Sequence, residues 1–197
     1  MKIAILLGSV RQGRQSHKVA HYLKTLLAGQ AVQTDLIDLG TDTLPIYGHD
    51  EQGHNNVIGL VSARLDSADA LLLVTPEYHG SFSGVLKNAL DHFWAEFKRK
   101  PIGVVAVSSG RMGGISASTQ LQQVVLNLGG IALPGKLVVT EVQEAFDEKG
   151  NLQDGGLAAR AEKFLAEYLW YADAIYQKKT TVNGVTKAVQ KTSLVDA

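Results

Sequence analysis

Ala70-Leu71-Leu72-Leu73-Val74 is a continuous apolar run near the middle of the chain, and the polar segment Thr75–Gly80 follows it directly. An apolar run without polar alternation is typical of a strand buried on both faces of a parallel sheet. Two similar runs, Ile3–Leu7 and Ile102–Val107, also end in loops of small and polar residues. The sequence therefore predicts parallel strands whose carboxyl ends carry the unusual residues.

Longer amphipathic segments separate these runs. Apolar residues recur at helical spacing in five stretches: Ser16–Ala28, Val57–Ser67, Ser83–Phe97, Ser116–Leu128 and Leu157–Tyr176. Two further strands are expected at Thr34–Leu39 and Leu137–Thr140. Strict alternation of this kind predicts an α/β fold with a doubly wound, five-stranded parallel sheet and helices on both faces. Few topologies remain for such a sheet, and we expect the flavodoxin-like strand order 2-1-3-4-5. We expect one domain over residues 1–178 and a loose polar tail over 179–197.

The composition excludes several classes of function. The chain has 19 Lys and Arg against 19 Asp and Glu, so its formal net charge of zero gives no sign of a nucleic acid or membrane partner. It has no cysteine, so any redox chemistry must come from a bound cofactor. The apolar start is broken at Gly8, too early for a secretory signal, and no run approaches the ~20 apolar residues of a membrane span. We therefore expect a cytoplasmic protein.

The first loop has the character of a phosphate site. Gly8-Ser9-Val10-Arg11-Gln12-Gly13-Arg14-Gln15-Ser16 lies between a strand and a helix. Its hydroxyls, its helix N-terminus and the guanidinium groups of Arg11 and Arg14 all favour an anion. The alternative is a solvated loop in which Ser16 merely caps the helix. Neither the P-loop nor the dinucleotide pattern is present, so a mononucleotide phosphate fits better than a pyrophosphate.

Three segments together resemble a known family. In chain order they are Gly8-Ser9-Val10-Arg11 in the first loop, Pro76-Glu77-Tyr78-His79 and the run Ser83–Asp91, and they match the NADPH-dependent FMN reductase family in the same order. His79 in place of the commoner Asn, and Ser83 in place of a Pro, are similar to its azobenzene-reductase-like members. The resemblance covers about residues 2–176 and implies a flavodoxin-like fold.

The resemblance also implies which residues bind FMN. It assigns the phosphate to Ser9, Arg11, Gln15, Ser16 and His17, with Arg14 as a further donor from the loop reasoning above. It assigns the flavin ring, largely through backbone groups, to Pro76, Glu77, Tyr78 and His79. The third loop, Ser108–Gly114, matches the segment near the pyrimidine side of the ring, with Ser108, Ser109, Gly110 and Gly113 as the expected contacts.

Other candidate sites have plainer interpretations. His49 and His54 flank Asp50 and Glu51, but their spacing fits no metal motif and a solvated loop is the expectation. Lys87 and Asp91 are spaced for an ordinary helical ion pair. Trp94 lies off the core stripe of its helix and fits either a subunit interface or partial burial, and the aromatic residues of the last helix allow the same two interpretations.

The expected function is an NAD(P)H-dependent FMN oxidoreductase, a quinone or azo reductase. Hydride would pass from the nicotinamide to the flavin and then to quinones, azo compounds or free flavin, with no catalytic side chain assigned. The resemblance implies a homodimer or homotetramer. There are two alternatives. One is a flavodoxin-type electron carrier without a nicotinamide site, and the other is a scaffold that binds no flavin and acts through its interaction surface.

Overall fold

The computed structural model describes residues 1–49, 55–111 and 113–193. The strands are β1 (Lys2–Leu7), β2 (Gln33–Asp38), β3 (Ala70–Tyr78), β4 (Ser81–Phe82), β5 (Pro101–Val107) and β6 (Ile131–Val139). The helices are α1 (Ser16–Ala28), α2 (Asn55–Asp66), α3 (Gly84–His92), α4 (Ile115–Asn127), α5 (Val142–Ala145) and α6 (Gly155–Ser193), with a short 3₁₀ turn, η2 (Ala95–Phe97).

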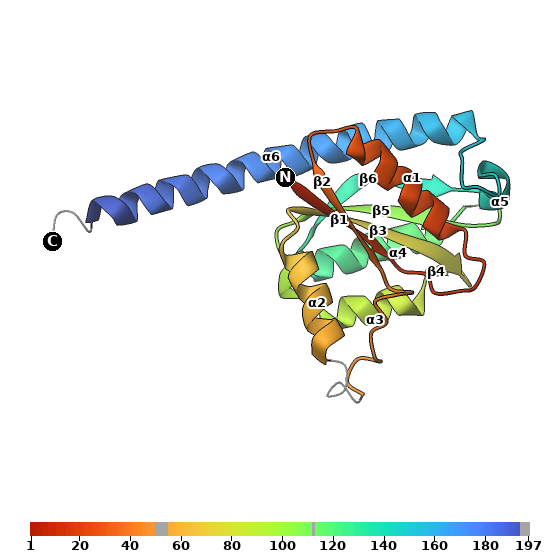
Figure 1. Ribbon diagram of the computed structural model, residues 1–197, viewed down its shortest axis with the longest axis horizontal. Coiled ribbons are helices and arrows are strands. Elements are labelled where there is room, and N and C mark those ends of the chain that lie inside the picture. The colour runs from red at the N-terminus through yellow and green to blue at the C-terminus, as the bar shows by residue number, and fades with distance from the viewer. Residues whose placement is uncertain (50–54, 112, 194–197) are drawn as a thin grey trace.

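The sheet has the predicted topology. Its path is β2-β1-β3-β5-β6 with parallel pairing throughout, and the two-residue β4 pairs antiparallel with the end of β3. Apart from β4, this is the order 2-1-3-4-5, so the doubly wound fold is confirmed. Figure 1 shows α1 and α6 on one side of the sheet and α2 and α3 on the other.

Alternation along β1 explains why the sheet is buried on both faces. Ile3, Ile5 and Leu7 belong to a core cluster that also holds the apolar residues of α1 and α6. Ala4 and Leu6 belong to a second cluster, which the apolar residues of α2, α3 and α4 complete. Since successive side chains of a strand point to opposite faces, one unbroken apolar run supplies both cores.

Several elements differ in their bounds from the sequence expectation. The third helix ends at His92, because Phe93 is extended (φ −122°, ψ 130°), and a 3₁₀ turn brings Phe97 back into the core. The final strand begins at Ile131, before the expected Leu137.

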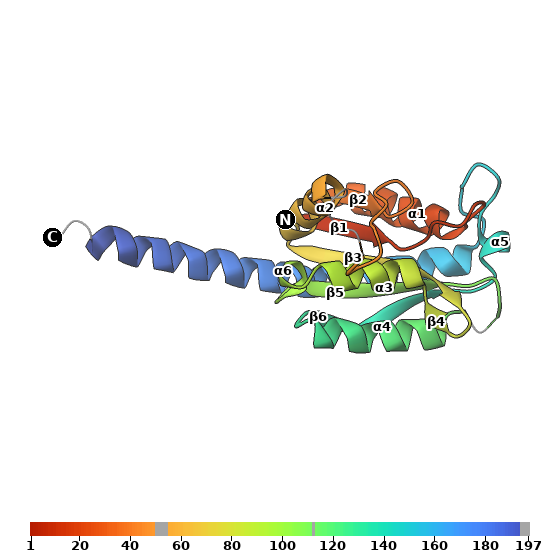
Figure 2. The same cartoon turned by 90° about the horizontal axis from the view of Figure 1, so that it is seen from below.

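The final helix is longer than expected. α6 continues to Ser193, through most of the segment expected to be a loose tail. Figure 2 shows this helix leaving the body of the molecule at one end. The division into a domain over 1–178 and a tail over 179–197 stays a prediction. Within the ranges that the structure describes, none of the helices is both long and apolar enough to cross a membrane.

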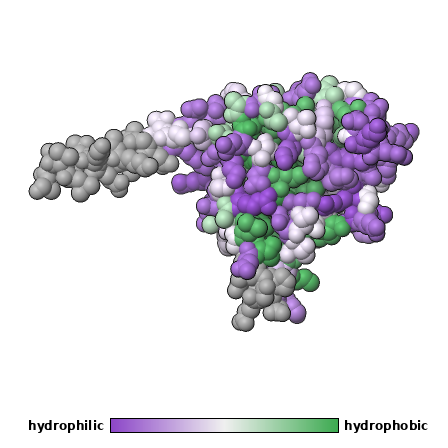
Figure 3. Space-filling model, in the orientation of Figure 1, coloured by the Kyte–Doolittle hydropathy of each residue, from purple (hydrophilic) through white to green (hydrophobic). Residues whose placement is uncertain are grey.

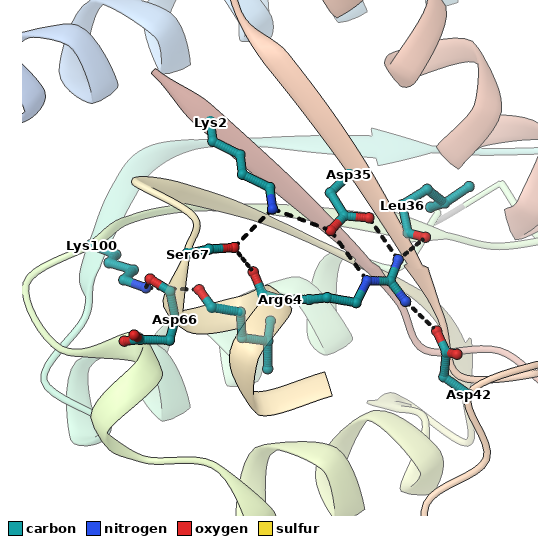
Figure 4. A network of polar contacts seen from close by, with 9 residues as sticks. Lys2, Asp35, Leu36, Asp42, Arg64, Asp66, Ser67 and Lys100 are labelled. Atoms are coloured by element: carbon teal, nitrogen blue, oxygen red, sulfur yellow. Dashed lines mark hydrogen bonds and ion pairs between the residues drawn. The ribbon is translucent and has the colours of Figure 1, made fainter. Parts of the chain in front are cut away.

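A charged network fixes α2 to the edge of the sheet (Figure 4). Arg64 of α2 donates to the Asp35 carboxylate on β2 at 2.6 Å and to Asp42 at 2.7 Å. Lys100, almost fully buried, donates to the Leu65 and Asp66 carbonyls at the end of α2. These bonds satisfy carbonyls that a helix end otherwise leaves without partners.

The same network makes the stability of the fold depend on pH. The hydrogen bond from Arg64 lowers the pKa of Asp35, with smaller contributions from the charges of Arg64 and Lys2, against the opposing effect of burial. Because the pKa of Asp35 is lower in the folded protein than in the unfolded chain, its ionised form stabilises the fold. This stabilisation is fully present above the unfolded-state pKa of about 3.9, and it is lost as the pH falls through the lower pKa of the folded state.

We therefore expect Arg64→Met to lower the free energy of unfolding by about 2 kcal/mol at pH 7. The difference from the parent should narrow as the pH falls below about 4, because the carboxyl is then protonated. Urea unfolding over a pH series measures it. Arg160→Met is the matched control, since the Arg160 guanidinium pairs with Asp154 at 3.6 Å and both side chains of that pair are exposed. If the difference in unfolding free energy between Arg64→Met and the parent did not change with pH, the Arg64–Asp35 interaction would not be its source.

Candidate functional site

The candidate site lies where the order of the strands reverses. β1 pairs with β2 on one side and β3 on the other, and the register aligns Leu7 with Val74. In the next pair, Pro76 is aligned with Val107. The loops after β1, β3 and β5 therefore leave the sheet at one edge, at the position where doubly wound sheets bind ligands.

A cavity of about 270 Å³, here the polar cavity, joins these three loops. Ten of the residues expected to bind the cofactor line it: Ser9, Arg11, Arg14, Gln15, Ser16, Pro76, Glu77, Tyr78, Ser108 and Ser109. His17, His79, Gly110 and Gly113 do not line it. Five further lining residues were not expected: Gln12, Gly13, Val107, Val142 and Gln143.

Two serine hydroxyls in the polar cavity have no protein partner. Ser9 and Ser16 are 1% and 2% exposed, and neither Oγ atom has a hydrogen-bond partner within the described part of the chain. Ser16 begins α1, whose N-cap Gln15 makes no side-chain cap bond and whose first turn has no acidic residue. A buried hydroxyl normally has a partner, and a helix N-terminus favours an anion. The chemistry of this cradle fits a phosphate group.

Arg14 is held inside the protein by a carboxylate. Its guanidinium donates two parallel hydrogen bonds to Asp38 at the end of β2, at 2.6 and 2.5 Å, and also donates to the Ser9 carbonyl. A Cβ atom on Gly40 would lie 2.5 Å from the Arg14 Nη1, so glycine makes room for this arrangement. We infer that Arg14 shapes the first loop and does not donate to a phosphate.

Two neighbouring side chains, those of Arg11 and His17, are not paired with a carboxylate within the described residues, unlike Arg14. Arg11 is exposed, and its guanidinium makes no hydrogen bond or ion pair within residues 1–49, 55–111 and 113–193. His17 approaches the Arg14 carbonyl through Nδ1 and packs edge-on against His21, with the ring centroids 6.4 Å apart. Of the two guanidinium groups of the first loop, that of Arg11 is therefore the one left available to an anion.

Ser83 joins the first loop to the second. Its hydroxyl caps α3 by accepting from the Leu86 amide, and it donates to the Gly8 carbonyl. Its own amide donates to the buried Thr75 hydroxyl at 3.0 Å. A proline here would lack that amide. The serine that departs from the commoner family pattern thus has a structural account.

The second loop is fixed to α4. The Glu77 carboxylate accepts the Ala117 amide in the first turn of that helix at 3.1 Å. Gln120 bonds both to the Gly80 carbonyl and to the Ser81 hydroxyl. Glu77 is therefore engaged by a helix N-terminus, and Tyr78, 39% exposed, remains as the open side chain of this loop.

His79 occupies a backbone conformation that few residues accept. It has φ +52° and Gly80 has φ +77°, and together they form the two-residue connection between Tyr78 and Ser81, which pair across the hairpin. Positive φ at both central residues is the signature of a type I′ turn, which favours Asn-Gly. Histidine is among the few other residues enriched at positive φ. The replacement of Asn by His is therefore compatible with the turn.

The third loop is packed against the end of β6. A Cβ atom on Gly113 (φ +59°) would lie 2.3 Å from the Thr140 side chain. Glu141 has φ +43°, and the chain then turns so that the Val142 amide donates to the Ser108 carbonyl. This brings Val142 and Gln143 into the polar cavity. No sequence motif marks these two residues, but β6 lies next to β5, so its loop must reach the same edge.

A second, larger cavity borders the first. This apolar cavity, of about 840 Å³, lies between the first loop, the segment after β2 and the start of α3. It is lined by Gly8, Ser9, Val10, Arg11, Leu39, Gly40, Thr43, Leu44, Ile46, Tyr78, Ser83, Gly84, Val85 and Asn88. Ser9, Arg11 and Tyr78 line both cavities. Apart from the first-loop residues and Tyr78, the residues that line it were not expected from the sequence.

The remaining sequence candidates have separate outcomes. Lys87 and Asp91 form the expected i,i+4 ion pair at 2.6 Å. Trp94 is 64% exposed, and the Lys98 ammonium lies 5.6 Å from its ring. The His49–His54 segment falls mostly outside the described residues, since 50–54 are not among them. Among the residues that are described, no cluster of three metal-ligating side chains occurs.

Comparison with known proteins identifies the class. The model of a family described as NADPH-dependent FMN reductase matches residues 1–144. The chain therefore belongs to the NADPH-dependent FMN reductase family, and with it to the oxidoreductases that use FMN with NAD(P)H as reductant. The predictions of family, enzyme class and cofactor are confirmed.

Individual relatives agree with this class. The NADPH azoreductase of Bacillus sp. (strain OY1-2) is 30% identical over 167 residues, which cover 84% of this chain and 86% of the relative. The FMN-dependent NADPH-azoreductase of Staphylococcus aureus (strain USA300) is 31% identical over 186 residues, which cover 88% and 96%.

Solved structures agree as well. The flavoenzyme NAD(P)H:(acceptor) oxidoreductase FerB from Paracoccus denitrificans superimposes with a TM-score of 0.73 at 26% identity, covering 89% of this chain and 97% of that one. A flavodoxin from Streptococcus pneumonia TIGR4, at 14% identity and a TM-score of 0.60, shares the fold.

The role of Arg14 can be tested by a double-mutant cycle with Asp38. If Arg14 positions the first loop, Arg14→Met and Asp38→Ala should each weaken FMN binding about tenfold, roughly 1.4 kcal/mol. The double variant should be no weaker than the weaker single, because both remove one interaction. Fluorescence titration of the apoprotein with FMN measures this. Unchanged or tighter binding by Asp38→Ala would instead indicate that a freed Arg14 reaches the phosphate.

His79 is tested by separating backbone from side-chain effects. His79→Val should lower the free energy of unfolding by about 1–2 kcal/mol, because a β-branched residue is strained at positive φ. His79→Asn should unfold like the parent. His21→Val is the control, since His21 is exposed on the helix α1, where histidine and valine have similar helix propensities. A stable His79→Asn variant that loses flavin reduction would show a chemical role for the imidazole.

Proposed function

We propose that the polar cavity holds FMN and that the protein transfers reducing equivalents from NAD(P)H to small acceptors such as quinones, azo compounds or free flavin. The observation that carries this is the pair of buried, unpartnered hydroxyls, Ser9 and Ser16, at the helix N-terminus beside the switch point. A phosphate would supply the acceptors that both hydroxyls lack.

The chain's own groups divide the work of binding. Ser9, Ser16 and Arg11 would hold the phosphate, while Gln15, whose amide donates to the Gly13 carbonyl at 3.1 Å, keeps the loop in shape. The backbone of residues 76–79 and 108–110 would face the flavin ring. When bound, FMN accepts hydride equivalents from the nicotinamide and passes electrons on, so the protein has to supply position and not an acid or base. We assign no catalytic side chain.

An electron carrier without a nicotinamide site is the second candidate. Carriers that dock on a basic partner need a negatively charged surface around the flavin. Here the Arg11 guanidinium lines the polar cavity without a partner in the described part of the chain, whereas Arg111 is neutralised by its 3.2 Å pair with Glu141. An unpaired cation beside the cavity suits an anionic nicotinamide cofactor better. The relatives named as NADPH azoreductases support the same choice.

The homodimer or homotetramer implied by the resemblance stays a prediction, and one surface suits it. Tyr47, Trp94 and Leu126 are 56%, 64% and 61% exposed. Tyr47 and Trp94 border a groove of about 410 Å³ between α3 and α4. Figure 3 shows apolar side chains over the region that α2 and α3 occupy in Figure 1. Exposed aromatic side chains of this kind are enriched in subunit interfaces. The cytoplasmic location likewise stays a prediction.

The function is tested by mixing the FMN-loaded protein with NADPH, and separately with NADH, without oxygen. We expect rapid loss of the absorbance of oxidised flavin, followed by its return when a quinone or azo compound is added. Persistence of the colour with both nicotinamides would indicate a carrier.

The phosphate cradle is tested in the same preparation. Ser9→Ala with Ser16→Ala should weaken FMN binding by about 100-fold, because hydrogen bonds to a charged group contribute about 1.5–3 kcal/mol each. Ser62→Ala with Ser67→Ala is the control, since these hydroxyls lie on and after α2 and have protein partners. Equal loss of FMN in both pairs would contradict the cradle.

A further inference from the structure

The hairpin of β3 and β4 carries the loop that would face the flavin ring. In it, Tyr78 pairs with Ser81 across the turn His79-Gly80. β4 has only two residues, and a hairpin as short as this is at best marginally stable by itself in water. Tyr78 and His79 are both exposed. The position of the turn must therefore be fixed by contacts from outside the hairpin.

The two ends of this loop are fixed by bonds that do not reach the turn. The buried Thr75 hydroxyl accepts the Ser83 amide at 3.0 Å and donates to the Pro76 carbonyl at 2.9 Å. The Glu77 carboxylate accepts the Ala117 amide at 3.1 Å. These bonds hold the base of the hairpin, where the chain leaves the sheet and where it enters α3.

The turn itself is held by one side chain of α4, that of Gln120. Its amide nitrogen donates to the Gly80 carbonyl at 2.9 Å, and its oxygen accepts the Ser81 hydroxyl at 2.8 Å. Because a carbonyl can only accept, the first bond fixes the orientation of the amide and directs its oxygen to the hydroxyl. The same nitrogen lies 3.2 Å from the Ser116 hydroxyl, one helical turn earlier. Figure 2 shows β4 beside α4.

The position of a ring-facing loop affects the reduction potential of a bound flavin. Reduction adds electrons to the ring and leaves the phosphate unchanged. The potential therefore depends on how much better the protein binds the reduced form than the oxidised form. Protein groups near the ring can favour one of the two forms. Groups at the phosphate act on both forms alike.

We propose that Gln120 is a positioning residue for the flavin reaction, because it fixes the His79-Gly80 turn against α4 and thereby sets the reduction potential of bound FMN. This rests on the proposed function. Gln120 lines neither the polar nor the apolar cavity, so it acts through the loop and not on the cofactor. It also lies in none of the motifs that the sequence analysis assigned to a site.

Gln122 provides a matched control on the same helix. Both glutamines are half-buried, but the Gln122 amide donates to the Leu133 carbonyl of β6 at 2.7 Å and not to the hairpin. Methionine has a similar length and helix propensity, and it has no hydrogen-bond donor. Gln120→Met and Gln122→Met should therefore lower the melting temperature by similar amounts. A difference between them in flavin properties then reports on the hairpin.

The main measurement is the reduction potential of bound FMN, determined by equilibration with a reference dye. For Gln120→Met we expect the ratio of the affinities for oxidised and reduced FMN to change about tenfold, a shift of about 30 mV for a two-electron couple. The rate of anaerobic flavin reduction at saturating NADPH should fall at least tenfold, since a small misplacement of reacting groups has an effect of this size. Gln122→Met should match the parent in both quantities.

Ser81→Ala tests whether the effect passes through the turn. This variant removes the hydroxyl that the Gln120 oxygen accepts, so the potential should shift in the same direction as in Gln120→Met, by a smaller amount. The double variant should shift the potential no further than Gln120→Met alone, because both changes break one connection. Additive shifts would show that the two residues act independently and would overturn the proposal.

Three other results would also overturn it. An unchanged potential in Gln120→Met would show that fixing the turn does not affect the ring. Weaker FMN binding with an unchanged potential would show a structural role only. An equal shift in Gln122→Met would assign the effect to α4 as a whole. Failure of the parent protein to bind FMN or to be reduced by NADPH would instead refute the proposed function, so the two failures are distinguishable.

Discussion

Parallel pairing of β1 between β2 and β3 is the constraint on which the site depends. The pairing places Leu7 beside both Asp38 and Val74, so that the first loop, the end of β2 and the second loop leave the sheet together. Apolar residues on both faces of β1 bury it in two cores at once, and a shift of one residue would exchange those faces. The geometry of the cavities therefore follows from the packing of the strand beneath them.

The loops above the sheet are held by their own polar groups, and this determines which groups stay free for a ligand. Arg14 is engaged by Asp38, Ser83 by Gly8, and Glu77 by the start of α4. The hydroxyls of Ser9 and Ser16 have no partner among the described residues, although both are buried. A polar group that is buried without a partner costs free energy, so a ligand that satisfies it gains that free energy on binding. Which polar side chains have protein partners and which have none thus identifies the phosphate cradle better than the residue types alone.

The features of the structure that depend on local sequence pattern could be predicted from the sequence alone. Apolar runs and helical spacing predicted the order of elements and the doubly wound sheet, and small and hydroxyl residues after three strands predicted the edge at which the cavities lie. What it could not predict depends on long-range placement. The Asp38 partner of Arg14 lies 24 residues away, so a free phosphate donor and a structural ion pair look alike in the sequence. Val142 and Gln143 enter the polar cavity only because Glu141 turns the chain at positive φ. The apolar cavity combines Leu44, which lies in no motif, with Val85 of the Ser83–Asp91 run, and these two segments are far apart in sequence.

The contrast between the two cavities bears on specificity. A site made of unpaired buried donors discriminates strongly, because a ligand that lacks the matching group leaves them unsatisfied. The polar cavity, with Ser9 and Ser16, has this character and suits a single cofactor. In the apolar cavity the Asn88 amide and the Ser83 hydroxyl are already paired, so away from the shared Ser9 and Arg11 it distinguishes ligands mainly by shape and area. Shape alone gives modest discrimination, so the two cavities differ in how strictly each can recognise a ligand.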